Sequence, residues 1–446
     1  MRIGWLGKAA GAVVLLSTGA GGAAAQTGAA DTVPASERMW IAAKMLAAVE
    51  THFAHWEGVP DLDLDAAFRD YAAKAASTAD RRSFSLASIE FLARLRNGHT
   101  GFSDPWLRER YGAPLGFALE EAEGGWVVRE SRLAGLEPGD RVVTVDGEPV
   151  DVQVDRLLPC ISASSPREAV RKLWFMGAAL WPERFTLGLA DGREFEVRRG
   201  GQELLPVEPS RFEARMLDDG IAWLRIPHFE TPEMEDSAIA FLAANAGAAA
   251  LVVDVRRNGG GTTPTRLIGA LMGRPYRGFA QSTSFDVGLY SAYHRIKQMV
   301  TPDALDDYTR GYIDAFAGFE RPRLAFPGVV ERPGTPVFDG PVVILVDGGC
   351  ASACEDFALP FASSGRGTLV GEPTSGSTGQ PYMWSFENGM SFRVSARRVY
   401  MPDGAPFEGV GIVPDEQVRP TAEDRRRGAD PVAERALEVA SRAARG

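Results

Sequence analysis

The chain is poor in cysteine and histidine, and it has no excess of basic residues. Only three of its 446 residues are Cys and five are His, and the formal net charge is −11. Three cysteines cannot form a disulfide-stapled scaffold, and an odd number leaves at least one free thiol. Without a cationic excess to neutralise phosphates, nucleic acid is excluded as the main partner. No H-E-x-x-H motif or similar ligand cluster occurs, so we predict neither a metal nor a cofactor.

Long hydrophobic runs are also lacking, and a short apolar stretch lies at the N-terminus. MRIGWLGKAA carries Arg2 and Lys8, GAVVLLSTGA follows, and AAAQ (23–26) offers small residues before a cleavage point. This pattern predicts a signal peptide over residues 1–25. The apolar run is too short to span a bilayer, which disfavours the alternative of an uncleaved anchor. We therefore expect a periplasmic or secreted protein with no stable membrane insertion after cleavage.

The rest of the chain is long enough for two or three domains. Residues 34–106 form an N-terminal helical segment in this prediction. Apolar residues at helical spacing predict helices over 36–53, 64–77 and 85–98, the last ending at the left-handed stop Asn97-Gly98.

Two further regions differ in pattern. Residues 110–200 contain short alternating runs between turn signals and predict a small β-rich domain. Residues 210–420 alternate buried strand and helix patterns, which favours an α/β core. The Arg-rich tail, 421–446, is predicted to form a surface helix.

The stretch GGCASACEDFA (348–358) places Ser352 where a strand gives way to a helix. Ser352 is either an ordinary N-cap or a nucleophile raised on a turn at the positive end of the helix dipole. Cys350 and Cys354 flank it and are expected to be small buried packing residues. Whether Cys350 pairs with Cys160 or Cys354 stays open.

The glycine run RRNGGG (256–261) follows an apolar strand and precedes a helix. It is either a tight turn or a source of exposed N–H groups that bind an anion. No phosphate-binding motif is present. An oxyanion hole formed by the N–H of Gly259 or Gly260 together with that of Ala353 is therefore the functional alternative.

A nucleophilic serine needs a base, and His99 is the strongest of the five histidines. It lies directly after a helix end, where the dipole stabilises an imidazolium. Of the others, His52 and His55 are expected to be surface or packing residues, His228 is an outside candidate, and His294 lies in a polar stretch. The group that orients His99 is Thr100, Glu372 or Glu408.

Five motifs in order resemble the C-terminal processing (tail-specific) peptidase family, and more closely its tricorn-core-like branch. They are NGHTGFSD (97–104), LVVDVRRNGGG (251–261), CASACEDFA (350–358), GRGTLVGEPTSGSTGQP (365–381) and FEGVGIVPDE (407–416). The resemblance implies an α/β fold: a ClpP/crotonase-like peptidase core with an N-terminal helical segment and an inserted PDZ-like β-rich domain. It also implies that Ser352 is the nucleophile.

The resemblance also bears on the base. One branch of the family uses a lysine 25 residues after the serine, and Ser377 stands at that position here. The other branch uses a histidine, which His99 matches, and a glutamate, which Glu408 matches. The additional serine of that tetrad, just before the histidine, is Gly98 in this chain. We therefore expect Thr100 or a water to lie between His99 and Glu408.

RLAGLEPGDRVVTVDGEPV (132–150) is similar to the PDZ domains of the family, and PLGFAL (114–119) resembles their carboxylate-binding loop. This implies that Leu115, Gly116 and Phe117 bind a peptide through their main chain. A loop with a glycine beside a strand is suited to that role. The helical insertion over 151–184 departs from the family pattern and is either a lid or plain packing.

These observations predict an exported serine endopeptidase that cleaves extended or poorly folded polypeptides, recruited by their C-termini through the PDZ-like domain. Neutral His99 is the expected base, so activity should fall when it is protonated. The alternatives are a peptide-binding or apolar-ligand-binding protein that does not cleave, and crotonase-like thioester chemistry, which export disfavours. No oligomeric state is predicted.

Overall fold

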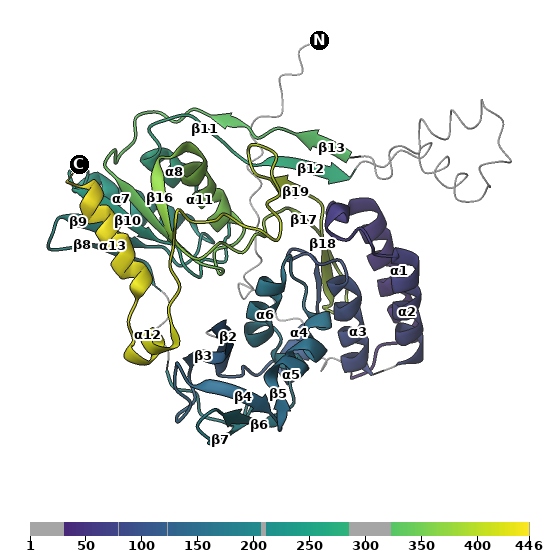
Figure 1. The fold of residues 1–446 in the computed structure, drawn as a ribbon. Coiled ribbons are helices and arrows are strands. Elements are labelled where there is room, and N and C mark those ends of the chain that lie inside the picture. The colour runs from purple at the N-terminus through teal and green to yellow at the C-terminus, as the bar shows by residue number, and fades with distance from the viewer. Residues whose placement is uncertain (1–30, 79, 123, 207–210, 285–322, 446) are drawn as a thin grey trace, which may run out of the picture.

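The computed structural model describes residues 31–78, 80–122, 124–206, 211–284 and 323–445. The predicted signal peptide and His294 lie outside these residues. Within them, the chain forms an N-terminal helical layer, an inserted β-rich module and an α/β core (Figure 1). No helix in the described part of the chain is long and apolar enough to cross a membrane.

The N-terminal helical segment is confirmed. Its helices are α1 (Ala35–His52), α2 (Leu64–Ser77) and α3 (Arg81–Ala93). They pack on a three-stranded sheet of β1 (Gly101–Ser103), β18 (Ser391–Ser395) and β17 (Pro381–Ser385). This layer thus joins the N-terminal helices to residues 381–395, far along the chain.

The third helix begins earlier and ends earlier than its periodicity predicts. The carboxylate of Asp80 accepts hydrogen bonds from the N–H groups of Arg82 and Ser83, which caps the helix at residue 81. The left-handed residue after the helix is Arg96 (φ 45°), not Asn97 or Gly98. The segment that carries His99 is therefore a turn of its own beyond the helix.

The inserted β-rich module contains a sheet whose main strands have the order β2-β3-β4-β6-β7, with β2 at one edge. Its strands are β2 (Phe117–Ala122), β3 (Gly125–Ser131), β4 (Arg141–Val145), β5 (Glu148–Pro149), β6 (Arg184–Leu189) and β7 (Glu194–Arg198). Its helices are α5 (Val150–Leu157) and α6 (Pro166–Phe175), preceded by α4 (Pro105–Tyr111). Trp126, Trp174 and Trp181 lie in its core, and α6 packs against β2.

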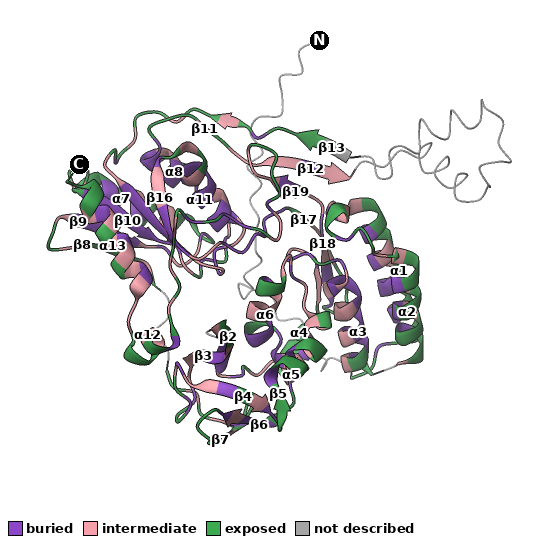
Figure 2. Ribbon diagram, viewed as in Figure 1, coloured by how far each residue is buried: buried purple, intermediate pink, exposed green. Residues whose placement is uncertain are grey.

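The α/β core is built on a six-stranded sheet of order β20-β16-β15-β10-β9-β8, in which only β8 is antiparallel to its neighbour. The strands are β8 (Glu213–Met216), β9 (Ile221–Arg225), β10 (Ala250–Asp254), β15 (Val342–Val346), β16 (Gly367–Gly371) and β20 (Glu416–Gln417). Figure 2 shows the central strands buried. Their continuous apolar runs are typical of a parallel sheet covered on both faces.

Helices cover both faces of this sheet. On one face lie α7 (Pro232–Ala244), α8 (Thr265–Leu271) and α11 (Ala353–Ser364). The other face is covered by α13 (Pro431–Ala443), through Val432, Ala436 and Ala440. A helix is present after residue 421, as predicted, and α13 exposes Glu434 and Glu438 while its apolar stripe packs on the core. The short α12 (Ala422–Arg427) precedes it.

The remaining elements are short and lie around the core. They are β11 (Tyr276–Arg277), β12 (Ala280–Ser284), β13 (Arg323–Phe326), β14 (Val330–Glu331) and β19 (Arg398–Tyr400), with 3₁₀ turns η1 (Trp56–Gly58), η2 (Leu158–Cys160) and η3 (Ala178–Leu180). The carboxyl ends of parallel β10 and β15 lead to the glycine run and to Ser352, so the sheet brings these two motifs together.

Candidate active site

Ser352 occupies a strained turn between β15 and α11. It is the N-cap of α11, but its backbone has φ 57° and ψ −123°. An ordinary N-cap lies in the β region, and positive φ is costly for a residue with a Cβ. Such strain is concentrated at functional sites. The geometry therefore favours a raised nucleophile over a plain N-cap.

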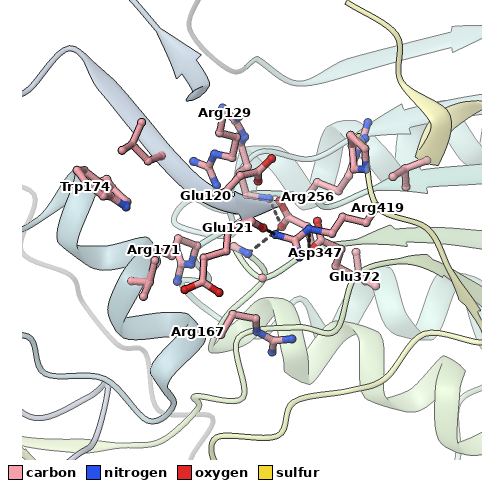
Figure 3. Close-up of a pocket in the computed structure, with 18 of the residues that line it drawn as sticks. Glu120, Glu121, Arg129, Arg167, Arg171, Trp174, Arg256, Asp347, Glu372 and Arg419 are labelled. Atoms are coloured by element: carbon pink, nitrogen blue, oxygen red, sulfur yellow. Dashed lines mark hydrogen bonds and ion pairs between the residues drawn. The ribbon is translucent and has the colours of Figure 1, made fainter. Parts of the chain in front are cut away.

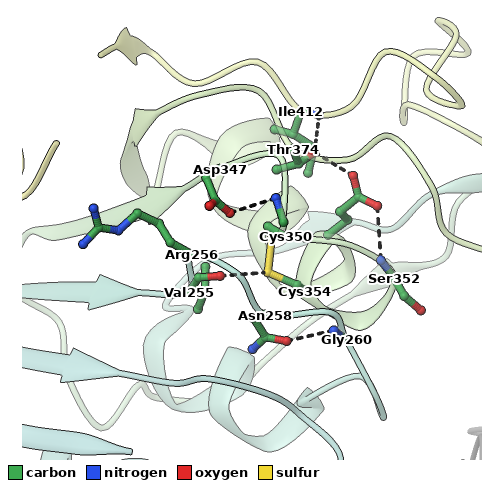
Figure 4. The surroundings of a disulfide bond; sticks show 12 residues. Val255, Arg256, Asn258, Gly260, Asp347, Cys350, Ser352, Cys354, Thr374 and Ile412 are labelled. Carbon is green, nitrogen blue, oxygen red and sulfur yellow. Dashed lines mark hydrogen bonds between the residues drawn. A yellow bond between two sulfur atoms is a disulfide. The ribbon is translucent and has the colours of Figure 1, made fainter. Parts of the chain in front are cut away.

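A disulfide between Cys350 and Cys354 spans this turn (Figure 4). Both cysteines are fully buried, and Cys160 is free. The pairing that the sequence left open is therefore Cys350–Cys354. The expectation that these two are simple packing residues is wrong, because they covalently close the turn that presents Ser352.

Glu355 fixes the same turn from inside the protein. Its buried carboxylate accepts hydrogen bonds from Ser352 N–H (3.2 Å), Ser377 N–H (3.1 Å), Gly376 N–H (2.6 Å) and the Thr374 hydroxyl (2.6 Å). Burial raises the pKa of Glu355 to about 7, although these donors oppose the shift. Our sequence analysis missed this residue. The Ser-x-x-Glu spacing of a capping box was the available signal.

The glycine run lies against the turn, as the oxyanion prediction requires. A Cβ on Gly260 would stand 2.7 Å from Ser352 Cβ and 2.9 Å from Ala353 N, so only glycine fits there. The N–H of Gly260 donates to Asn258 Oδ1 (2.9 Å). Among the hydrogen bonds of the described residues, none uses the N–H of Ala353 or Gly259. Those two N–H groups, one in the glycine run and one directly after Ser352, are therefore free to bind a ligand.

Ser377 connects His99 to the turn. His99 Nδ1 lies 3.0 Å from Ser377 Oγ, and the carbonyl of Ser377 accepts a hydrogen bond from Ser352 N–H (2.9 Å). No direct hydrogen bond joins His99 and Ser352 in the described part of the chain. Catalytic contacts of this kind are often long in the absence of substrate. Ser377 thus contacts His99 through its side chain and Ser352 through its main chain.

Glu408 reaches His99 only through two serines. Ser164 donates to Glu408 Oε1 (2.6 Å), and the hydroxyl oxygens of Ser164 and Ser377 are 3.3 Å apart. The expected intermediary, Thr100, instead donates to Asn97 Oδ1, and Glu372 lies beside Arg419, away from His99. The expectation that Thr100 fills the gap is therefore wrong, and the hydroxyls of Ser164 and Ser377 bridge it.

Ser377 Oγ is the hydroxyl that faces His99 Nδ1 in this relay. Ser164 donates to Glu408 Oε1 and, at the longer distance of 3.3 Å, to Ser377 Oγ. Serine chemistry requires the tautomer of His99 in which Nδ1 carries the proton and donates to Ser377 Oγ, because Nε2 is then free to accept a proton.

Gly98 makes room for the serine that performs this task. A Cβ at position 98 would clash with Ser377 Oγ and would stand 2.6 Å from Glu168 Oε1. The hydroxyl expected from the residue before the histidine therefore comes from position 377. Position 377 would hold the lysine of the other family branch.

Asn97 holds the turn that carries His99. Its buried side chain donates to Glu408 Oε1 (2.8 Å) and accepts from the N–H of His99 (2.9 Å). The pKa of His99 is lowered well below its ordinary value, first by burial and then by the positive charges of Arg393 and Lys172. His99 is consequently neutral at pH 7 and able to accept a proton.

A pocket of about 630 Å³ lies between the inserted module and the carboxyl ends of the core strands (Figure 3). Eight arginines and five carboxylates line it. Arg167 and Arg171 extend into it from α6, and Arg167 also donates to the carbonyl of Thr374 (2.6 Å). Gly348 and Gly349 line the pocket and lead directly to Cys350, so the pocket borders the turn of Ser352.

The predicted peptide-binding loop begins the edge strand β2. The side chains of Leu115 and Phe117 are buried in the core of the module, and Gly116 has φ 82°. Leu204 lies against Gly116, where it leaves no space for a Cβ. Only main-chain groups of this loop are therefore suited to contact a ligand. Within the described residues, no group of three or more His, Cys, Asp or Glu side chains could hold a metal ion.

Comparison with known proteins agrees with this geometry. Residues 220–418 match the family model described as Peptidase family S41. The chain is 25% identical over 294 residues to a carboxyl-terminal-processing protease of Synechocystis sp., covering 64% of this chain and 56% of that protein. It is 27% identical over 348 residues to a chloroplastic C-terminal processing peptidase of Tetradesmus obliquus, covering 74% and 63%. The match thus spans less than two thirds of each relative.

Solved structures share the fold. The structure of mature CPAF complexed with lactacystin has a TM-score of 0.64 at 15% identity, covering 91% of this chain and 98% of that chain. A putative peptidase from Parabacteroides merdae has a TM-score of 0.51 at 17% identity, covering 92% and 97%. These confirm the predicted mixed α/β peptidase fold. With the family-model match over residues 220–418 and the two related proteases, the comparisons support a C-terminal processing peptidase.

Proposed function

We propose that this protein is a serine endopeptidase that cleaves extended polypeptides. The observation that carries the proposal is the position of Ser377, which hydrogen-bonds His99 with its side chain and the Ser352 turn with its carbonyl. A nucleophile, a neutral base and a series of hydrogen bonds that orients the base are thereby assembled on rigid elements. The names of the related proteases, both C-terminal processing enzymes, support the same reaction.

The mechanism uses the tautomer of His99 that has a proton on Nδ1 and a free Nε2. His99 Nε2 takes the proton of Ser352 Oγ, which attacks the peptide carbonyl carbon and forms a tetrahedral intermediate. The N–H groups of Ala353 and Gly259 stabilise the oxyanion. The imidazolium then gives its proton to the leaving amine, and the C–N bond breaks. His99 next deprotonates a water, which hydrolyses the acyl-enzyme and restores Ser352.

The inserted module recruits the substrate in this proposal. The strand β2 is an edge strand that begins at Leu115, Gly116 and Phe117, and an edge can pair with an extended peptide. The pocket next to β2 and α6 is lined by Gly348 and Gly349, which come three to four positions before Ser352 in the chain. Its excess of arginine favours a peptide with a carboxylate terminus or acidic side chains.

Export is part of the proposal. Disulfides persist mainly in oxidising compartments, and the buried Cys350–Cys354 bond supports a periplasmic or secreted location. The N-terminal pattern of residues 1–25 gives the same indication.

The proposal is tested by incubating the purified protein with a disordered model polypeptide and following fragments by mass spectrometry. We expect cleavage by the wild type and by His228→Ala, a control at another histidine. Ser352→Ala and His99→Ala should each lose activity by about 10³-fold or more. Equal rates for His99→Ala and wild type would refute the assigned base. Binding of the polypeptide without any cleavage by the wild type would favour a peptide-binding protein.

A further inference from the structure

Two buried polar atoms behind the relay have no hydrogen-bond partner. They are Nδ1 of His55 and Oε2 of Glu408, which lie 4.0 Å apart. The side chains are only 2% and 5% exposed. Of the two expectations for His55, a surface position is wrong and a buried packing position agrees with its burial. Unpaired buried polar atoms are costly and need an explanation, and here two of them face each other.

The tautomer of His55 is fixed from its other side. Its Nε2 lies 2.9 Å from the carbonyl oxygen of Arg397 and 2.9 Å from Ser395 Oγ. A carbonyl oxygen only accepts, so Nε2 carries the proton and donates it. In a neutral imidazole, Nδ1 is then a bare acceptor that points towards Glu408.

The two oxygens of Glu408 have different surroundings. Oε1 accepts from both Asn97 (2.8 Å) and Ser164 (2.6 Å), whereas Oε2 has only His55 Nδ1 before it. If Glu408 were ionised, its Oε2 and the unprotonated Nδ1 of His55 would be two hydrogen-bond acceptors that face each other and repel. A proton on Oε2 removes this repulsion.

We propose that Glu408 is a neutral acid whose proton resides on Oε2 and faces His55 Nδ1, 4.0 Å away, so that His55 is a positioning residue of the active site. The inference deepens the proposed function and rests on it. Glu408 would act as a neutral acid that accepts a hydrogen bond at Oε1, and no negative charge would reach His99 through the relay. A serine-protease triad, in contrast, ends in an anionic carboxylate.

The charges around the pair favour this neutral form. Burial first, and then the nearby carboxylates of Glu355 and Glu168, raise the pKa of Glu408 to about 8, while Ser164 and Arg398 oppose the shift. Burial, and then Arg398, lower the pKa of His55 to about 3, against the hydrogen bond to Arg397. At pH 6.5 the protonated imidazolium of His55 and the ionised carboxylate of Glu408 are therefore both disfavoured.

The protonation state can be measured without any assay of activity. Nitrogen NMR of the His55 ring at pH 6.5 should show protonated Nε2 and unprotonated Nδ1. The infrared difference between wild type and Glu408→Gln should contain the carbonyl band of a protonated carboxylic acid. An imidazolium at His55, or an ionised Glu408 at this pH, would overturn the proposal. These readouts decide the matter even if the protein cleaves nothing.

Kinetics then test the role in positioning. Glu408→Gln keeps an acceptor at Oε1 and a donor towards His55, so below pH 7 its kcat should fall by no more than about tenfold, roughly one neutral hydrogen bond. Any change in kcat near pH 8 in the wild type should vanish in this variant. A loss of about 10³–10⁴-fold, as when an anionic triad carboxylate becomes an amide, would refute a neutral Glu408.

His55→Phe removes the acceptor and keeps a ring of similar size. We expect a lower kcat with KM nearly unchanged, and a shifted pH dependence near pH 8. His52→Phe is the matched control, because His52 stacks on Tyr382 and lies outside the relay. A pH profile of His55→Phe identical to that of the wild type would show that His55 has a structural role alone.

Discussion

The two halves of the candidate site are built in different ways. The nucleophile half lies within one short stretch, where a disulfide and the carboxylate of Glu355 hold the Ser352 turn. The base half is assembled from separate parts of the chain, with His99, Ser377, Ser164 and Glu408 joined only by hydrogen bonds. The first is fixed by local covalent and main-chain structure, and the second exists only when the tertiary fold is complete.

Glu355 is where the two halves meet, and changing it should have the largest effect. In Glu355→Gln an amide NH₂ would replace one acceptor oxygen, and two of the four donors would lose their partner. At about 1–3 kcal/mol for each unsatisfied buried group, we expect a loss of about 2–6 kcal/mol in the free energy of unfolding. Urea unfolding measures it, with exposed Glu387→Gln as the control. An unchanged midpoint would contradict this assignment.

Ser377→Ala breaks the base half at its first link. The relay would no longer orient His99, and kcat should fall by about 10²-fold with little change in KM. The matched control is Ser375→Ala in the same loop, because Ser375 Oγ is buried without a hydrogen-bond partner. Equal effects of the two substitutions would mean that the loop matters only for packing.

Replacing both cysteines of the disulfide tests the nucleophile half. The disulfide closes a very short loop, so Cys350→Ala/Cys354→Ala should lower the free energy of unfolding by about 2 kcal/mol in the chain-entropy model. Cys160→Ala serves as the control. The kcat of the double variant should fall, because the disulfide no longer holds the strained Ser352 turn. Full activity would show that Glu355 alone suffices to hold the turn.

Each half of the site contains one buried acid, so the pH dependence of stability can distinguish the two halves. Glu355 and Glu408 have folded-state pKa values of about 7 and about 8, above the ordinary 4.5. The folded protein therefore keeps protons that the unfolded chain has released, and stability falls as pH rises from about 4.5 towards 8. Each group contributes at most about 1.4 kcal/mol per pH unit. Glu408→Gln should remove about half of the pH dependence of the urea midpoint between pH 4.5 and 7 and nearly all of it between pH 7 and 8.

The same division explains what the sequence could predict. The strand, the two glycines and Ser352 are consecutive, so their pattern predicted the turn, and Gly98 correctly indicated that Glu408 does not touch His99 directly. The bridging serines could not be found in this way. Ser164 and Ser377 are 213 positions apart, and their meeting depends on how α6 docks on the core.

Helix α13 illustrates a second limit. Its arginine-rich neighbourhood indicated a surface helix. It did not reveal that Val432, Ala436 and Ala440 form a stripe that the sheet buries. Long charged side chains around such a stripe obscure a helix that is apolar on one side only.

Ser164 belongs to the loop before α6, and Arg167 on α6 donates to Thr374, which in turn binds Glu355. The inserted module is therefore a structural part of the candidate site as well as an attachment beside it. Excising it would remove a hydroxyl from the relay, and turning it by a few degrees would stretch bonds on both halves of the site. The orientation of one domain relative to the other is thus itself a variable of the reaction.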